Sequence, residues 1–209
     1  MKKEIVVNRT LEETKVAVLE DGKLSDLFIK RRESEKILNN IYKGKVQNIV
    51  PALNSAFVDI GFGKSAYLGI DDIVAQKNEK NIGNMIKPGQ DIMVQIYKEP
   101  ISTKGPKVTM EISLPGRLLV YMPFSNNIGI SKNIGAKQEY DRLKRIVADL
   151  KVDIPGGIIV RTEVEDATEE EIKREIKYLT RLWASIVRRF EDAKPMSLIH
   201  NDRDRKSVV

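Results

Sequence analysis

Lysines and aromatic side chains are mixed with strand-forming residues between positions 40 and 70. Strand formers dominate the segments 40–46, 56–61 and 65–68. The candidate binding residues here are Lys43, Lys45, Phe57, Lys64 and Tyr67. On a small β-barrel, such residues can bind single-stranded nucleic acid, because bases stack on the rings while lysines track the phosphates. The alternative is that Phe57 and Tyr67 belong to the barrel core and the lysines to a solvated face.

Two further lysines, Lys98 and Lys104, flank the predicted loop 100–106. Loops of small OB-type barrels commonly contact the ligand. Both lysines are therefore candidate RNA-binding residues, with ordinary surface solubility as the alternative.

Arg161 and Thr162 directly follow a predicted strand over 158–160. At a strand end, an arginine fork and a hydroxyl can converge on a phosphate, because both donate hydrogen bonds to its oxygens. The pair is a candidate phosphate site. The alternative is that Arg161 pairs on the surface with Glu163 or Glu165.

The sequence shows no catalytic centre. Its one histidine is His200, and no nucleophile is paired with a base. Asp202 and Asp204 resemble a metal-binding pair, but solvated loop carboxylates are the simpler interpretation. We assign no catalytic residue, metal site or cofactor to this chain.

Several elements must position these residues. Segment 4–29 is expected to form a β-hairpin with its turn at Asp21-Gly22, a strong turn signal. Further barrel strands are predicted at 92–97 and 107–112, and the polar run 76–84 is predicted to be a loop.

A second module is expected after the barrel. Its predicted strands are 118–122, 128–131 and 158–160, and a helix is predicted over 136–150. Another helix begins after Thr168, where Glu171 completes a capping box. Trp183 lies on the apolar stripe of that helix, which predicts a core residue rather than a stacking one.

The composition suggests the class of partner. The chain has 209 residues and a net charge of +6, from 36 basic and 30 acidic residues, which favours a polyanionic partner. It has no cysteine, and no apolar run approaches the roughly 18 residues of a membrane span. The charged start leads into a strand rather than a signal peptide, so we expect a cytoplasmic protein without a membrane span.

The order of these motifs resembles known RNA-binding proteins. Segments 44–46, 56–61 and 66–68 resemble the S-one RNA-binding domain, a five-stranded OB-type barrel. Nearly the whole chain resembles the amino-terminal half of the ribonuclease E/G family, through the segments 40–45, 95–100, 103–107, 112–117 and 159–162.

This resemblance implies an α+β fold in which the OB-type barrel is inserted between an RNase H-like segment and an α/β 5′-sensor module. The implied domains are an incomplete RNase H-like segment (1–39), the S-one barrel (40–110), the 5′-sensor (111–198) and the start of an RNase H-like return (199–209). Because the match fades beyond His200, we expect the chain to be truncated before the catalytic domain.

The resemblance also implies site residues. In the family, the pair matching Arg161 and Thr162 reads the 5′-monophosphate of RNA, and positions matching Gly116 and Val120 line the space for the terminal nucleotide. Family members hydrolyse RNA with Mg²⁺ held by aspartates further downstream, many share structural Zn²⁺ through cysteines, and they form homo-oligomers.

The implied function is the RNA-binding and 5′-monophosphate-sensing half of an endoribonuclease of rRNA processing and mRNA decay, inactive by itself. Its partner would be single-stranded RNA. The alternatives are a stand-alone S-one RNA-binding regulator without nuclease activity, and an interaction protein whose barrel binds protein.

Overall fold

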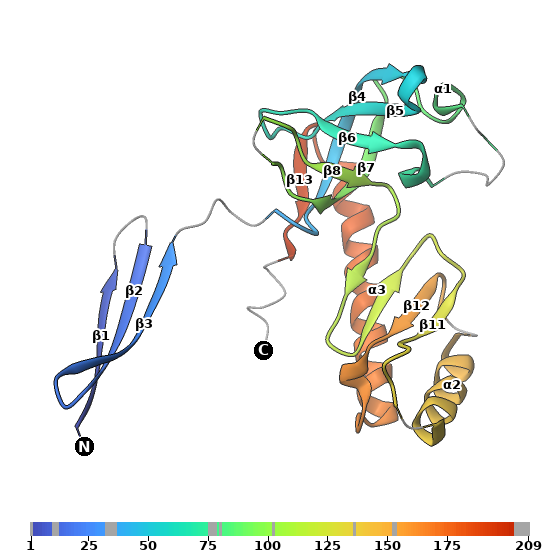
Figure 1. Ribbon diagram of the computed structural model, residues 1–209. Coiled ribbons are helices and arrows are strands. Elements are labelled where there is room, and N and C mark those ends of the chain that lie inside the picture. Colours follow the sequence, from blue (N-terminus) through green and yellow to red (C-terminus); the bar gives the residue numbers. More distant parts are fainter. Residues whose placement is uncertain are drawn as a thin grey trace. The chain divides into compact units, whose positions relative to one another are not determined.

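The computed structural model describes residues 2–9, 13–31, 37–74, 79, 81–101, 103–135, 137–151 and 154–202. The chain divides into two compact units, Met1–Lys36 and Ile37–Val209. Each unit is described separately. The α+β class is confirmed, with a closed five-stranded barrel and a second sheet packed by helices (Figure 1).

The first unit is an antiparallel sheet of β1 (Lys3–Arg9), β2 (Glu13–Glu20) and β3 (Lys23–Arg31). The predicted hairpin turn is confirmed between β2 and β3. Asp21 and Gly22 both have positive φ, at 49° and 78°, as a type I′ turn requires. Apolar side chains of β1 and β3 are exposed on this sheet, among them Ile5, at 69%, and Leu24, at 58%.

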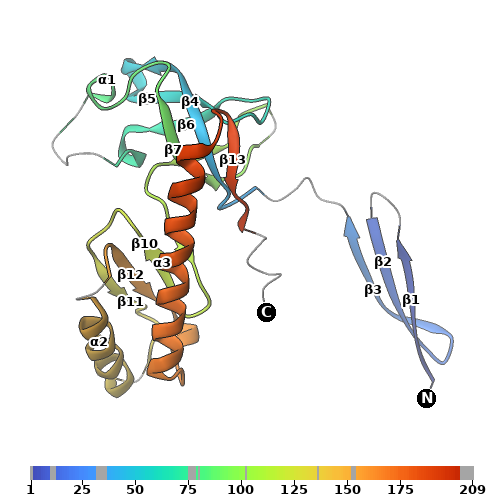
Figure 2. The same cartoon turned by 180° about the vertical axis from the view of Figure 1, so that it is seen from behind.

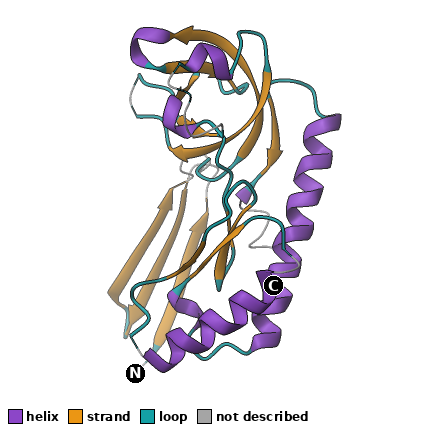
Figure 3. Ribbon diagram, turned by 90° about the vertical axis from the view of Figure 1, so that its right-hand side faces the viewer, coloured by secondary structure: helices purple, strands orange, loops and turns teal. Residues whose placement is uncertain are grey.

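The barrel consists of β4 (Ile41–Val50), β5 (Ser55–Asp59), β6 (Ala66–Gly69), β7 (Asp91–Lys98) and β8 (Lys107–Thr109). The strands follow the order β4-β5-β6-β8-β7, and β7 pairs back onto β4, which closes the barrel. Only the β6–β8 pair of the barrel is parallel. The strands coil round a common core (Figure 3), which is filled by alternate side chains such as Val58, Leu68, Val94 and Val108.

A strand from the far end of the described chain joins the barrel. β13 (Ser197–His200) pairs antiparallel with β4, a pairing the sequence did not indicate. The backbone of Gly61 comes close to this return, since a Cβ there would meet the carbonyl oxygen of Met196. Gly61 has φ +76°, which favours glycine.

The second module contains the sheet β11-β12-β10-β9 and two helices. Its strands are β9 (Leu114–Pro115), β10 (Leu119–Met122), β11 (Ile128–Ile130) and β12 (Gly157–Val160), and its helices are α2 (Lys137–Lys151) and α3 (Glu169–Asp192). The predicted capping box is confirmed, because Thr168 Oγ1 accepts from Glu171 N and Glu171 Oε2 from Thr168 N. Trp183 packs against the core and meets Phe124 edge to face at 5.4 Å, as its predicted core position requires.

The helices cover one face of this sheet. Leu119, Tyr121, Ile158 and Val160 are buried on that face, while the alternate residue Ile159 is 39% exposed on the other. In Figures 1 and 2, α3 runs from this sheet to the barrel. None of the helices in the described ranges is long and apolar enough to span a membrane.

Three local predictions need correction. The predicted loop 76–84 contains the short helix α1 (Ile82–Met85), whose Ile82 is fully buried, although residues 76–78 and 80 lie outside the described part. β8 ends at Thr109 rather than 112, because Met110 N turns to the carbonyl oxygen of Asp72. β9 was not predicted, since two residues are too short to show a period.

Candidate nucleic-acid interface

The barrel presents a row of aromatic and basic residues on its outer surface. Phe57, Tyr67 and Lys107 are register partners on β5, β6 and β8, and Lys98 of β7 follows opposite Lys107. Register partners project from the same face of a sheet. We call Phe57, Tyr67, Lys107 and Lys98 the barrel row.

The two aromatic residues of the barrel row are not core residues. Their neighbours Ala56, Val58, Ala66 and Leu68 are fully buried, and alternation turns Phe57 and Tyr67 outward, where both are half-buried. Their rings meet edge to face, with centroids 6.2 Å apart. A base can stack only on an accessible ring face, so this orientation meets the requirement of a stacking platform.

Lys107 belongs to the barrel row but was absent from the sequence-based candidates. Its Nζ lies 5.2 Å from the centroid of Tyr67, within cation–π range. Lys98 Nζ lies similarly, 5.8 Å from the ring of Tyr97. The parallel pairing of β6 with β8 brings Lys107 beside Tyr67, and no local signal in the sequence marks this pairing.

The remaining predicted lysines lie in different surroundings. Lys45 is half-exposed and 3.9 Å from Asp91, while Lys64 and Lys104 are exposed on loops. Lys43 points toward the end of α3, where its Nζ donates to the carbonyl oxygens of Phe190, at 2.9 Å, and Ala193, at 3.0 Å. Cations are favourable at a helix C-terminus. In this arrangement Lys43 holds α3 against the barrel, so an RNA contact would require these bonds to break.

Tyr97, which precedes Lys98 on β7, is hydrogen-bonded to Asp72. Its hydroxyl group donates to Asp72 Oδ2 at 3.1 Å. Burial, and then the charge of Asp72, raise the pKa of Tyr97 above its usual value. Tyr97 therefore stays neutral around neutral pH and adds no negative charge beside Lys98.

The structure brings the predicted phosphate-site residues together. Arg161 Nη1 donates to the carbonyl oxygen of Gly116 at 2.8 Å, and its Nη2 to Glu163 Oε1 at 2.9 Å. Thr162 Oγ1 lies 3.3 Å from the other Glu163 oxygen and donates to it. One carboxylate thus meets both the guanidinium and the hydroxyl, the two groups proposed to hold a phosphate.

The ion pair with Glu163 was the alternative considered from the sequence. A hydrogen bond from its own backbone, and also the charge of Arg161, lower the pKa of Glu163. It is therefore ionised at neutral pH and occupies the position in which an anion could bind. Both groups of the pair are substantially exposed, so exchange with a bound anion requires little rearrangement.

A glutamate from α3 lies against Gly116. Glu175 Oε1 accepts from Leu118 N at 2.9 Å and also from Leu119 N. A Cβ at position 116 would collide with the same Glu175 oxygen, so only glycine leaves this carboxylate in place. The sequence did not indicate Glu175, because its contact depends on where α3 packs.

Val120 lies on the uncovered face of the second sheet. It is the register partner of Pro115 on β9 and of Ile159 on β12, and Ile159 is in turn paired with Gly129 on β11. Arg161 continues β12 in an extended conformation, so it projects from the same face as Ile159. This face therefore carries an apolar surface next to the Arg161 guanidinium.

No group of three or more metal-ligating side chains occurs within the described ranges. Asp202 is engaged with the barrel start, since its N donates to Asn40 Oδ1 and its Oδ2 accepts from Asn39. Asp204 lies outside the described residues. The residues that the structure describes therefore do not assemble the ligands of the Mg²⁺ or Zn²⁺ sites that the resemblance implies for longer proteins.

Comparisons with known proteins show which family this chain resembles. A model of the Ribonuclease E/G family matches residues 113–209. Ribonuclease G of Haemophilus influenzae is 40% identical over 210 residues, and ribonuclease G of Escherichia coli is 40% identical over 200 residues. Ribonuclease E of a Nostoc species is 30% identical over 192 residues. These alignments include 95%, 90% and 90% of this chain but only 43%, 41% and 28% of the respective relatives.

Proposed function

Because the chain belongs to the ribonuclease E/G family, we propose that it recruits RNA for an endoribonuclease of this family. The barrel binds single-stranded RNA, and the second module recognises a 5′-monophosphate. The intact enzyme would cleave precursor rRNA and mRNA in the cytoplasm. The chain spans about two fifths of its ribonuclease G relatives, so the activity of the whole enzyme is part of this proposal.

The observation that carries the proposal is the pairing of two chemically different sites on one chain. The barrel row offers ring faces and ammonium groups, which suit bases and backbone phosphates. Arg161 and Thr162 already share a carboxylate, which shows that their donors converge on one anionic group. A terminal monophosphate is such a group, whereas a triphosphate adds bulk and charge.

The division of labour within the chain is also proposed. Residues 1–39 contribute an incomplete RNase H-like segment, which fits the apolar side chains exposed on β1 and β3. Residues 40–110 form the RNA-binding barrel, 111–198 the 5′-sensor, and 199–209 the beginning of the RNase H-like return. No step of catalysis is assigned to this chain, because its described residues do not form a metal site.

The proposal predicts tight, salt-dependent binding of short single-stranded RNA, with a preference for a 5′-monophosphate over a 5′-hydroxyl. Each phosphate neutralised should add roughly 0.7 to the magnitude of the log–log salt slope. Fluorescence polarisation with both RNAs over a range of salt measures slope and preference together. RNA binding with no preference would support a stand-alone barrel protein, and absence of RNA binding would support a protein-binding role.

We also expect the purified chain to show no Mg²⁺-dependent cleavage of a labelled oligonucleotide. Metal-activated water requires ligands that the described residues do not supply. The matched control is a full-length relative assayed in the same buffer. Cleavage that persists through further purification steps would place a catalytic centre within this chain.

A further inference from the structure

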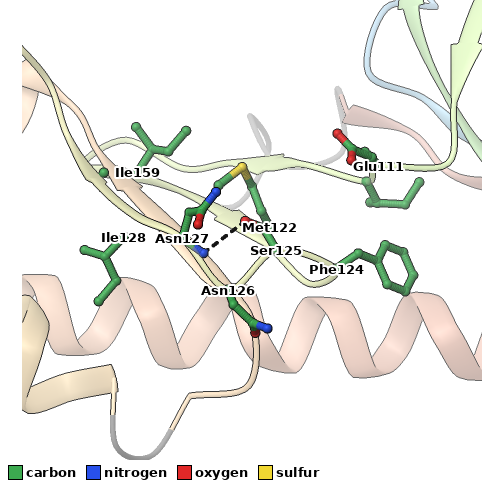
Figure 4. A pocket seen from close by; sticks show the side chains of 10 residues that line it. Glu111, Met122, Phe124, Ser125, Asn126, Asn127, Ile128 and Ile159 are labelled. Carbon is green, nitrogen blue, oxygen red and sulfur yellow. Dashed lines mark hydrogen bonds between the residues drawn. The ribbon is translucent and has the colours of Figure 1, made fainter. Parts of the chain in front are cut away.

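A pocket of about 570 Å³ is lined by residues of β10, β11 and β12, of the loop between β10 and β11, and of the segment between β8 and β9. Its apolar lining includes Met122, Phe124 and Ile159, and its polar lining includes Glu111 and Asn127. In Figure 4 the side chains of Ile159, Asn127, Met122 and Glu111 follow one another along one side, while Asn126 points the opposite way. A volume of this size is typical of small-ligand sites.

The pocket shares strands β10 and β12 with the candidate sensor residues. Ile159 lines it and is the register partner of Val120, and Arg161 lies two residues further along the same strand direction. Two residues of a strand advance by roughly 6.6 Å. An RNA whose terminal phosphate lies at Arg161 can therefore place a neighbouring nucleotide over Ile159.

The charge of the pocket favours a base over a phosphate. None of the described residues that line it is Lys or Arg, whereas Glu111 is anionic and Asn127 is an amide. Within the described part of the chain, neither the Glu111 carboxylate nor the Asn127 side-chain amide has a hydrogen-bond partner, because both residues form their hydrogen bonds through backbone atoms. A phosphate would be repelled here, but the N–H groups of a base would be accepted.

We propose that this pocket binds the base of the second nucleotide of a 5′-monophosphorylated RNA and selects guanine there. The proposal rests on the 5′-sensor function proposed above. Guanine presents N1–H and N2–H side by side, which a carboxylate accepts in bidentate fashion, and its O6 can accept from the Asn127 amide. Adenine would instead turn the lone pair of N1 toward the carboxylate. Met122 and Ile159 supply the apolar surface that a base ring buries.

The test uses the full chain and 3′-labelled pentamers that carry each of the four bases at the second position, with either a 5′-monophosphate or a 5′-hydroxyl. The affinity of the pentamer with guanine at the second position is expected to exceed that of the other pentamers by on the order of tenfold. Glu111→Gln should lower the affinity for the guanine pentamer to nearly that of the other pentamers, because the Gln amide NH₂ opposes one of the guanine donors. Glu170→Gln makes the same charge change on exposed α3 surface and should preserve the preference.

Equal binding of the four bases by the unaltered chain would overturn the proposal, and so would a guanine preference that Glu111→Gln leaves intact. If Glu111→Gln fails to fold, as judged by circular dichroism, Asn127→Ala replaces it, with the same loss expected. The comparison of pentamers with a 5′-monophosphate and with a 5′-hydroxyl tests the proposed 5′-sensor separately. A guanine preference without a monophosphate preference would support the pocket and reject the sensor.

Discussion

Replacing Arg161 with alanine is expected to abolish the preference for 5′-monophosphorylated RNA and to leave binding of 5′-hydroxyl RNA nearly unchanged. The guanidinium is held at 2.8 Å by the Gly116 carbonyl oxygen, so one of its donor edges already has a fixed direction. A hydrogen bond to a charged group contributes about 1.5–3 kcal/mol. Its loss corresponds to roughly ten- to a hundred-fold in relative affinity, measured by competition between the two RNAs.

The matched control is Arg145→Ala, which removes an exposed arginine of α2 whose Nε donates to a carbonyl oxygen of its own helix. Glu163→Gln provides a test in the opposite direction. Its carboxylate competes with the phosphate for Arg161 and Thr162, so the neutral side chain should raise affinity for the 5′-monophosphate. If Arg161→Ala weakened both RNAs equally, or neither, Arg161 would be only a surface ion-pair partner.

Replacing Phe57 and Tyr67 together with alanine is expected to produce the largest loss of RNA affinity. Base stacking contributes about 1–3 kcal/mol for each aromatic residue. Loss of both should weaken binding at least roughly thirty-fold, for RNAs with either kind of 5′ end. The measurement is RNA affinity at fixed salt, and the salt slope should change little because the lysines remain.

Tyr178→Ala is the control for the aromatic pair, because Tyr178 is 44% exposed on α3 and lies outside the barrel. Thermal unfolding must show that the double variant is folded, since both rings are half-buried against the strands. Unchanged affinity in a folded double variant would reject the stacking assignment. The cations of the barrel row would then remain as the only support for RNA binding by this face.

One helix contacts both the second module and the barrel. Near its start, α3 holds the loop before β10 through Glu175, and at its end it accepts the Lys43 ammonium group. A helix of 24 residues is roughly 36 Å long. Because it is a single continuous helix, the spacing between these two anchor points is set by its length rather than by a flexible linker.

Local signals in the sequence determined most of the elements. Asp21-Gly22 predicted the turn because two consecutive positive φ angles favour these residues. Thr168 and Glu171 predicted the start of α3 because a capping box satisfies donors within one turn. Residue type and position after a strand predicted Arg161 and Thr162 as a phosphate site, and the family resemblance added Gly116 and Val120.

Contacts between distant segments were decided by the tertiary structure. The outward orientation of Phe57 and Tyr67 depends on register, because a shift of one residue would have buried both rings. Lys107 joined them only through the parallel β6–β8 pair, and Lys43 was turned away from the barrel row by the end of α3. Glu175 could not be assigned to Gly116 in advance, because their 59-residue separation carries no periodic signal and the contact arises from helix packing.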